Sequence, residues 1–286
     1  MKFSSLGAAV VLAAGSAIAQ PAAQPPRGDL STLNDEFNAT TLDKKWARYD
    51  ELYGWPNKLK RFNVHTTTAG ALHMAPFDSV WVRDRSAPYL FQTVEGDFDV
   101  RVRGAGSETP AGTWSLGGLM ARVPNGLDAR TWEPRRENWH FITTGVGLDR
   151  HKAVTETKGT YNSYSSLKLR PFTSGWVELR LVRVGMTLFA LARPEGEASW
   201  QLRDRFYRME PNPYMQVGLI AYTGSDDVPP GPEDAVKEHD REQGCACRPA
   251  DGRGLDPLLP SEARNRLALA KPGSRTSARR PKPCRS

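Results

Sequence analysis

Cysteine is missing from most of this chain. The three cysteines that it has, Cys245, Cys247 and Cys284, all lie near the C-terminus. A folded region without cysteine has no disulfide, so its stability must come from a hydrophobic core. The Cys245-Ala246-Cys247 segment lacks the second ligand pair of a zinc site, so the sequence predicts no metal site there.

Long hydrophobic runs are missing too. The most apolar segment, residues 6–18, is shorter than the ~20 residues that a membrane-spanning helix needs. It follows Lys2 and ends in a small-x-small motif at residues 17–19, which is typical of signal-peptide cleavage sites. We therefore predict a signal peptide over residues 1–19 and cleavage before Gln20. The protein is expected to be secreted or periplasmic, with no membrane span.

A strongly charged folded domain is also absent, although the net charge of the chain is +7. Residues 244–286 hold ten Lys and Arg against three Asp and Glu, an excess equal to the net charge of the whole chain. The rest of the chain is close to neutral. Proteins that bind nucleic acid need a basic surface on their folded part, so we expect no nucleic-acid partner.

The composition of the chain changes at both ends of its central region. Residues 20–31 form a linker rich in Pro and Ala, and residues 227–286 form a tail rich in Arg, Pro, Ser and Ala. The tail contains too little apolar surface to offset its ordering entropy, which predicts disorder. Its abrupt start also resembles a change of reading frame, a hypothesis that resequencing the gene would test. Residues 32–226 are left as the folded domain.

The central region is a series of short strand patterns. In residues 176–200, Val177 and Leu179 alternate with charged residues, Gly185 permits a tight turn, and a second apolar strand follows. About a dozen such patterns are separated by Gly, Pro and Asn, and no long helical periodicity appears. The sequence therefore predicts an all-β fold, a two-sheet antiparallel sandwich.

Aromatic residues near polar residues are the candidates for ligand binding. Aromatic rings stack on the apolar faces of sugars, while polar side chains bond the hydroxyl groups. One aromatic group lies in the loop of residues 49–55. The second group, with the polar residues expected beside it, consists of Trp139, His140, Tyr161, Asn162, Tyr164, Arg122 and Glu137. The alternative role of a ring is core packing, which alternation with apolar residues predicts for Trp81, Trp176 and Trp200.

Carboxylates at catalytic spacing are hard to find. A retaining glycosidase needs two carboxyl groups about 5–5.5 Å apart. Asp97 and Asp99 would share one strand face, and Glu137 lies near Glu133. A solvated strand edge and surface ion pairs are the simpler explanations. The chain also lacks a Gly-x-Ser-x-Gly elbow. We expect no catalytic residue, and Glu137, Asp97 and Asp99 are the candidates if the protein is an enzyme.

Short motifs between residues 34 and 224 occur in a recognisable order. They are Asp35-x-Phe37 with Leu42 and Trp46, Gly96-Asp97-Phe98, Gly117-Gly118-Leu119-Met120, Glu137-Asn138-Trp139, Trp176-Val177-x-Leu179-Arg180-Leu181, Gly196-x-x-x-Trp200 and Val217-Gly218-Leu219. In order and spacing they resemble the DUF1349 family, the "regulation of enolase" proteins, within the concanavalin A-like jelly-roll superfamily. This resemblance implies a jelly-roll sandwich. The superfamily includes glycosidases, lectins and carbohydrate-binding modules.

The chain departs from this resemblance in three places. Relatives carry Ser-x-Asp-Gly where this chain has Arg193-Pro194-Glu195-Gly196, and catalytic members carry Glu-x-Asp-x-x-Glu where this chain has Val100 in place of the last Glu. Relatives also end in a further strand, which no segment after Gln243 matches, so the resemblance implies an unpaired sheet edge. Sandwich modules often hold a structural calcium ion, for which Asp35 is the candidate ligand.

Together these patterns predict an exported, monomeric β-sandwich protein without a catalytic role. It is expected to bind carbohydrate, with polysaccharide among the candidate ligands, on a concave, aromatic-lined sheet face. The alternatives are a glycoside hydrolase on the same scaffold and a structural or protein-interaction module. No cofactor is expected apart from the calcium ion considered at Asp35.

Overall fold

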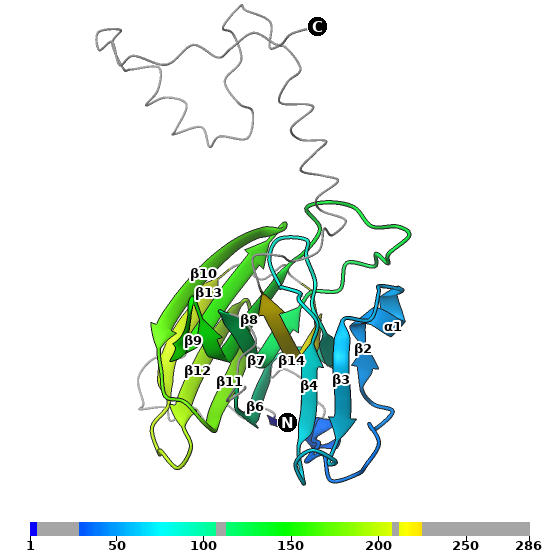
Figure 1. Cartoon of the computed structure of the whole chain (residues 1–286). Coiled ribbons are helices and arrows are strands. Elements are labelled where there is room, and N and C mark those ends of the chain that lie inside the picture. The colour runs from blue at the N-terminus through cyan, green and yellow to red at the C-terminus, as the bar shows by residue number, and fades with distance from the viewer. Residues whose placement is uncertain (5–28, 107–112, 208–211, 225–286) are drawn as a thin grey trace, which may run out of the picture. The chain divides into compact units, whose positions relative to one another are not determined.

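The computed structural model describes residues 1–4, 29–106, 113–207 and 212–224 (Figure 1). The chain divides into two compact units, Met1–His239 and Asp240–Ser286, and every described residue belongs to the first. The predicted tail lies outside the described residues, as does most of the predicted linker. None of the helices in the described part is long and apolar enough to span a membrane.

Two antiparallel sheets make up the fold, which confirms the predicted all-β jelly-roll sandwich. Sheet A has the order β1-β6-β11-β12-β13. Its strands are β1 (Lys2–Ser4), β6 (Phe98–Gly104), β11 (Val177–Val184), β12 (Thr187–Pro194) and β13 (Gln201–Tyr207). Sheet B has the order β10-β9-β8-β7-β14-β5-β2. Its strands are β2 (Ala47–Arg48), β5 (Tyr89–Glu95), β7 (Trp114–Arg122), β8 (Trp139–Gly147), β9 (Asp149–Tyr161), β10 (Tyr164–Pro171) and β14 (Tyr214–Gly224).

Four smaller elements complete the described part of the chain. Strands β3 (Leu59–Val64) and β4 (Leu72–Pro76) form a separate hairpin. The 3₁₀-helix η1 (Leu30–Leu33) precedes the first strand of sheet B, and the short helix α1 (Tyr49–Tyr53) follows it. Figure 1 shows the β3–β4 hairpin and α1 beside the larger sheets.

The hairpin of β11 and β12 forms where the sequence predicts it. Its two strands pair from Val177 opposite Pro194 to Val184 opposite Thr187. Gly185 has a φ of 58°, a left-handed conformation that glycine adopts without strain, and it makes the tight turn between the strands. From Val177 to Leu181 the apolar positions of β11 are buried and the charged positions between them are more exposed. The period of two therefore predicts both the strands and the face that each strand buries.

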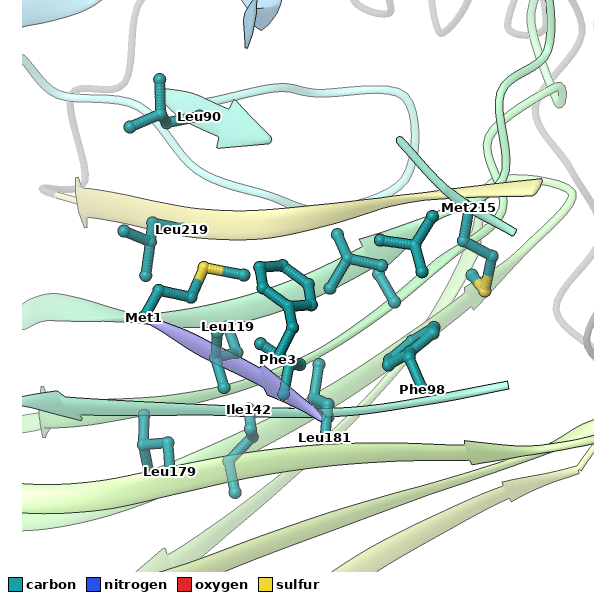
Figure 2. Packing of buried hydrophobic residues seen from close by; sticks show 14 of the residues in the cluster. Met1, Phe3, Leu90, Phe98, Leu119, Ile142, Leu179, Leu181, Met215 and Leu219 are labelled. Carbon is teal, nitrogen blue, oxygen red and sulfur yellow. The ribbon is translucent and has the colours of Figure 1, made fainter. Parts of the chain in front are cut away.

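The main core lies between the two sheets. Sheet A contributes Phe98, Leu179 and Leu181, and sheet B contributes Leu119 and Ile142, all fully buried (Figure 2). These side chains come from alternate positions along strands of opposite sheets. The apolar surface that they remove from water is the main source of stability, at roughly 25 cal/mol per Å².

Sheet B is also covered on its other face, away from sheet A. This outer face carries a second buried cluster that includes Tyr89, Phe141 and Tyr222. Helix α1 covers it through Tyr49, and a segment of residues 77–88, here called the strap, covers it through Trp81. Trp81 is buried, as the sequence predicts. The face is thus filled by protein side chains.

Strand β1 lies before the expected start of the folded domain and pairs with that domain in the full chain. The sequence predicts that the domain begins at residue 32, after a leader and a linker, but Lys2–Ser4 pairs with β6 in sheet A. Met1 and Phe3 point into the core between the sheets (Figure 2). The physical reason is the alternation of apolar Met1 and Phe3 with polar Lys2 and Ser4, which suits the edge of a half-buried sheet.

Candidate functional site

The residues predicted to bind a ligand together lie in three different places. Three of them belong to the outer face of sheet B, one faces sheet A, and three lie at the tip of a hairpin. The outer-face residues are Arg122, Glu137 and Trp139; His140 faces sheet A; and the tip residues are Tyr161, Asn162 and Tyr164. A single aromatic platform containing all of them does not form.

Trp139 is a core residue in this structure. Its side chain is completely buried, stacks on Phe141 at 5.4 Å between ring centroids, and meets Trp81 edge-on at 5.8 Å. The strap therefore leaves no face of this ring open to a ligand. The expectation that Trp139 binds sugar is wrong for this conformation, because the sequence does not reveal that the strap covers the sheet.

Arg122 and Glu137 form a buried ion pair next to Trp139. The Arg122 guanidinium donates to both carboxylate oxygens of Glu137, at 2.8 and 2.6 Å, and to the side-chain oxygen of Gln216 at 2.8 Å. Asn125 donates to the same carboxylate at 2.9 Å. Burial lowers the pKa of Arg122, but the Glu137 carboxylate outweighs burial and the pKa stays above its ordinary value. Arg122 therefore remains charged, and both oxygens of Glu137 are occupied.

A second buried polar network lies on the same face, and the sequence analysis missed it. The Tyr222 hydroxyl donates to Glu156 at 2.5 Å, and the Lys158 ammonium lies 2.8 Å from the other oxygen of Glu156. Lys158 also donates to the backbone carbonyl of Trp81 in the strap, at 2.9 Å. One sequence pattern does point to this network: Glu156 and Lys158 alternate with threonines along β9, which places both charges on one face of the strand. Nothing in the sequence places Tyr222 and the strap against them.

His140 lies on the opposite side of sheet B from Trp139. Its ring stacks on Phe206 of sheet A with 4.5 Å between centroids, and only 8% of the residue is exposed. Burial lowers the pKa of His140 to about 4, and the charge of Asp204 opposes this shift. His140 is thus a neutral core histidine. Adjacent residues of a strand point to opposite faces, so His140 and Trp139 cannot contribute to one binding surface.

The tip of the β9–β10 hairpin keeps its aromatic rings open to solvent. Tyr161 is 44% exposed and Tyr164 is 69% exposed. The two residues lie directly opposite each other in the ladder, so their side chains leave the same face about 5 Å apart at Cβ. Between them, Asn162 and Ser163 have φ values of 46° and 62°, which close the turn.

This turn is fixed by bonds to neighbouring segments. The Ser163 backbone N–H donates to the Glu137 carbonyl at 2.8 Å, and the Asn162 N–H donates to the side chain of Asn138 at 2.9 Å. The Ser163 hydroxyl also donates to Asp84 of the strap. Burial raises the pKa of Asp84, although Ser163 and the Arg135 N–H oppose this shift. The tip therefore presents two tyrosines on a rigid base.

The candidate carboxylates for catalysis lie far apart in the fold. Glu137 precedes β8 of sheet B, whereas Asp97 and Asp99 lie at β6 of sheet A. Asp97 accepts a bond from the Gly185 N–H at 2.7 Å, before the strand starts at Phe98. Asp99 accepts two bonds from Arg180, at 2.8 and 2.6 Å. Burial raises the pKa of Asp99, but the bonds from Arg180 and its neighbour Arg101 outweigh this and lower it overall.

The surroundings of Asp35 do not fit a calcium ion. Its carboxylate accepts bonds from the Phe37 N–H and the Trp46 indole N–H, both at 2.8 Å. Its backbone oxygen accepts a bond from the positively charged amino group of Met1 at 2.6 Å. Nowhere in the described residues do three His, Cys, Asp or Glu side chains group as metal ligands. Asp35 instead fixes the loop that enters the sandwich.

Two tryptophans expected in the core lie on the outer face of sheet A. Trp176 is 37% exposed, and its ring lies 3.9 Å from the Arg103 guanidinium. Trp200 is partly buried and lies 4.5 Å from the guanidinium of Arg193. The prediction that both rings are core is wrong, because each flanks a strand and packs on arginine.

Comparisons with known proteins support the fold. No protein-family model matches the chain, and no curated protein sequence does. A solved structure of xylan β-1,4-xylosidase from Bacillus halodurans shares 14% identity with a TM-score of 0.50, over 68% of this chain and 36% of that enzyme. A functionally unknown protein from Saccharomyces cerevisiae shares 17% identity with a TM-score of 0.46, over 63% of this chain and 87% of that protein. A GH16 endo-β-1,3(4)-glucanase shares 14% identity with a TM-score of 0.42, over 66% of this chain and 79% of that enzyme.

These similarities concern architecture. The chain spans about a third of the length of the xylosidase. At 14% identity the similarity to the xylosidase shows a shared fold alone.

Proposed function

We propose that this protein is exported and binds carbohydrate without cleaving it, through the tip of the β9–β10 hairpin. The exposed pair Tyr161 and Tyr164 carries the proposal. Two rings that leave one face of a rigid hairpin can stack on a sugar, and the amide of Asn162 between them can bond a hydroxyl. The signal peptide and membership of the DUF1349 family are further parts of the proposal, supported by the sequence motifs.

Catalysis has less support than binding. Both oxygens of Glu137 are bonded to Arg122, and the carboxylates of Asp97 and Asp99 belong to the other sheet. A retaining hydrolase would need two carboxyl groups about 5–5.5 Å apart with room for a sugar between them. The described residues named as candidates do not supply this arrangement.

A glycan array followed by calorimetry tests the proposal. We expect a polysaccharide or oligosaccharide to bind the full chain, and Tyr161→Ala combined with Tyr164→Ala to weaken binding at least about fivefold, since each ring contributes roughly 0.5–1.5 kcal/mol. Because both rings are exposed, the variant should unfold at the same urea concentration as the natural protein.

Tyr207→Ala is the matched control. Tyr207 is 62% exposed at the end of β13 in the other sheet, so its loss should leave sugar affinity unchanged. A sugar that binds both variants equally well would contradict the proposal. Release of reducing sugar during the titration would favour the hydrolase instead.

A further inference from the structure

The edge of β6 is only half covered by β1. The three residues of β1 pair with Asp99, Val100 and Arg101. Strand β6 continues to Gly104, and no described strand pairs with residues 102–104 on this side. The backbone N–H and C=O groups of an open sheet edge are a template for another strand.

A cavity of about 660 Å³ opens beside this uncovered edge. The β6 segment forms one wall, and Met1 lies at the end next to β1. The apolar wall residues come from both sheets and from the β3–β4 hairpin: Leu72, Met74, Leu179 and Leu219. Trp176 and Arg103 also line the cavity. The cavity therefore continues the apolar interior of the sandwich to the edge where a strand is missing.

The register of β1 defines what a longer strand would meet. Lys2 lies opposite Arg101 and Phe3 opposite Val100, and opposite residues point to the same face. Continuing this register past Met1 adds two positions, one opposite Arg103 and one opposite Gly104. A strand of six residues, about 20 Å long, would cover the edge from 99 to 104. Its residues opposite 100, 102 and 104 would point inward, and those opposite Arg101 and Arg103 would point outward.

Strand β1 is a poor match for the charges of this edge. It places Lys2 directly opposite Arg101, and like charges at opposite positions of a ladder are destabilising. It also buries the amino group of Met1, and this burial lowers the pKa of that group to about 6 despite the nearby charges of Glu36 and Asp35. If the leader is removed at Gln20, as proposed above, the whole edge from 99 to 104 becomes open.

We propose that the β6 edge, with its cavity, is an acceptor site for a β-strand of another polypeptide that alternates apolar and acidic residues. Apolar side chains at the first, third and fifth positions fill the cavity and the places of Met1 and Phe3. Acidic side chains at the second and fourth positions face Arg103 and Arg101. Backbone bonds give the affinity and alternate side chains give the specificity, as in other cases of strand addition.

The chain does not supply this strand from its own tail. In residues 225–286, no apolar residue stands between two acidic residues, so the alternation is absent there. The first part of that stretch contains Val228-Pro229-Pro230-Gly231-Pro232, and proline lacks the N–H that pairing needs. The sequence of the tail thus favours a strand from a different molecule.

Capped six-residue peptides test the site on the full chain. The first peptide has valine at the first, third and fifth positions and glutamate at the second and fourth; a second has lysine in place of glutamate; a third is the first with N-methylated backbone amides. We expect the acidic peptide to bind at least tenfold more tightly than the basic one. The methylated peptide should not bind.

Two variants locate the binding at β6. Phe3→Ala weakens the competing β1, so the acidic peptide should bind this variant at least tenfold more tightly than the natural chain. Arg101→Glu leaves only Arg103 opposite an acidic position of the peptide, so the preference for the acidic peptide over the basic one should be largely lost. Because the Arg101 side chain is 41% exposed, the change is expected to leave the fold intact. Equal binding of all three peptides, or an unchanged preference in Arg101→Glu, would overturn the proposal. Neither result depends on sugar binding, which uses the other sheet.

Discussion

His140 shows how much a single residue depends on the face it occupies. It follows Trp139 in β8, yet the two rings lie in different cores, one against Phe206 of sheet A and the other under the strap. The pKa of His140 is lowered to about 4 because burial disfavours the charged ring. Its Nδ1 has no hydrogen-bond partner among the described residues. Protonation would place a charge between the sheets without a bonded acceptor at that nitrogen.

Stability should therefore fall as the pH drops from about 6.5 to about 4. In this window the unfolded chain, with a histidine pKa of 6.5, binds a proton that the folded chain does not bind. The histidine pKa is about 2.5 lower in the folded chain than in the unfolded chain, which corresponds to a loss of roughly 3 kcal/mol in the free energy of unfolding near pH 4. Urea unfolding at several pH values measures the effect.

His140→Gln is the control for this dependence. The variant has no titrating ring, so its unfolding free energy should change less than that of the natural protein between pH 6.5 and pH 4. Contributions from titrating groups that do not interact with His140 are the same in both proteins and cancel in the difference. Parallel pH profiles for the two proteins would show that His140 is accessible to solvent.

At the residue scale, sequence periodicity predicts faces but not partners. The alternation along β8 separates Trp139 from His140, and the same rule makes Lys158 and Glu156 neighbours on one face of β9. It cannot predict that Arg122 meets Glu137, because that contact joins residues fifteen positions apart across a loop. Removing one partner of such a buried pair usually costs about 3–5 kcal/mol, since the other charge stays buried.

The strap is the element that decides which aromatic rings are available. It crosses the outer face of sheet B and lies between β4 and β5 in the sequence. Several bonds to sheet B hold it there, among them the following three. The Ser79 N–H donates to the Thr223 carbonyl, the Arg83 N–H donates to the Ser165 hydroxyl, and Lys158 donates to the Trp81 carbonyl. Its contacts come from strands far away in the sequence. The alternation with apolar residues around Trp81 therefore predicts a buried ring but gives no hint that the segment lies across sheet B.

Trp81→Ala should destabilise the protein by about 3–5 kcal/mol. The ring is 1% exposed and contacts Tyr49, Tyr89 and Trp139 edge-on at 5.6–5.9 Å, so its loss removes a large buried surface and leaves a cavity. Urea unfolding followed by circular dichroism measures this change. Trp176→Ala removes a ring of the same size that is 37% exposed and should cost less than about 1 kcal/mol. Equal losses for the two variants would contradict the assignment of the strap as a core element.

The strands themselves were the most predictable elements. Apolar residues at every second position, bounded by Gly185 and similar turn residues, identify β11 and β12 from the sequence alone. The sandwich follows because each such strand must bury one face against a second layer. The candidate site was less predictable. Among the predicted ligand-binding residues, only those at the β9–β10 tip, Tyr161, Asn162 and Tyr164, keep the exposed position that ligand binding requires.

For the molecule as a whole, the N-terminal residues have two conflicting roles. Residues 1–19 have the pattern of a leader that is removed, yet Met1 and Phe3 fill part of the core between the sheets (Figure 2). The Phe3 backbone N–H also donates to the side chain of Asn34. A chain that begins at Gln20 would lose these contacts and expose Leu179 and Val100 beside the open edge of β6.

We expect the chain from Gln20 to be less stable than the full chain by at least about 3 kcal/mol, because truncating one buried Phe already costs about 3–5 kcal/mol. Urea unfolding of both forms measures the difference. Phe3→Ala in the full chain should reproduce most of it, since that ring is 3% exposed. Lys2→Ala should have an effect below about 0.5 kcal/mol, because the Lys2 side chain is mostly exposed and its ion pair with Glu36 lies at the surface. If Phe3→Ala and Lys2→Ala unfold alike, residues 1–4 are not part of the core in solution. The β6 edge is then already open in the full chain.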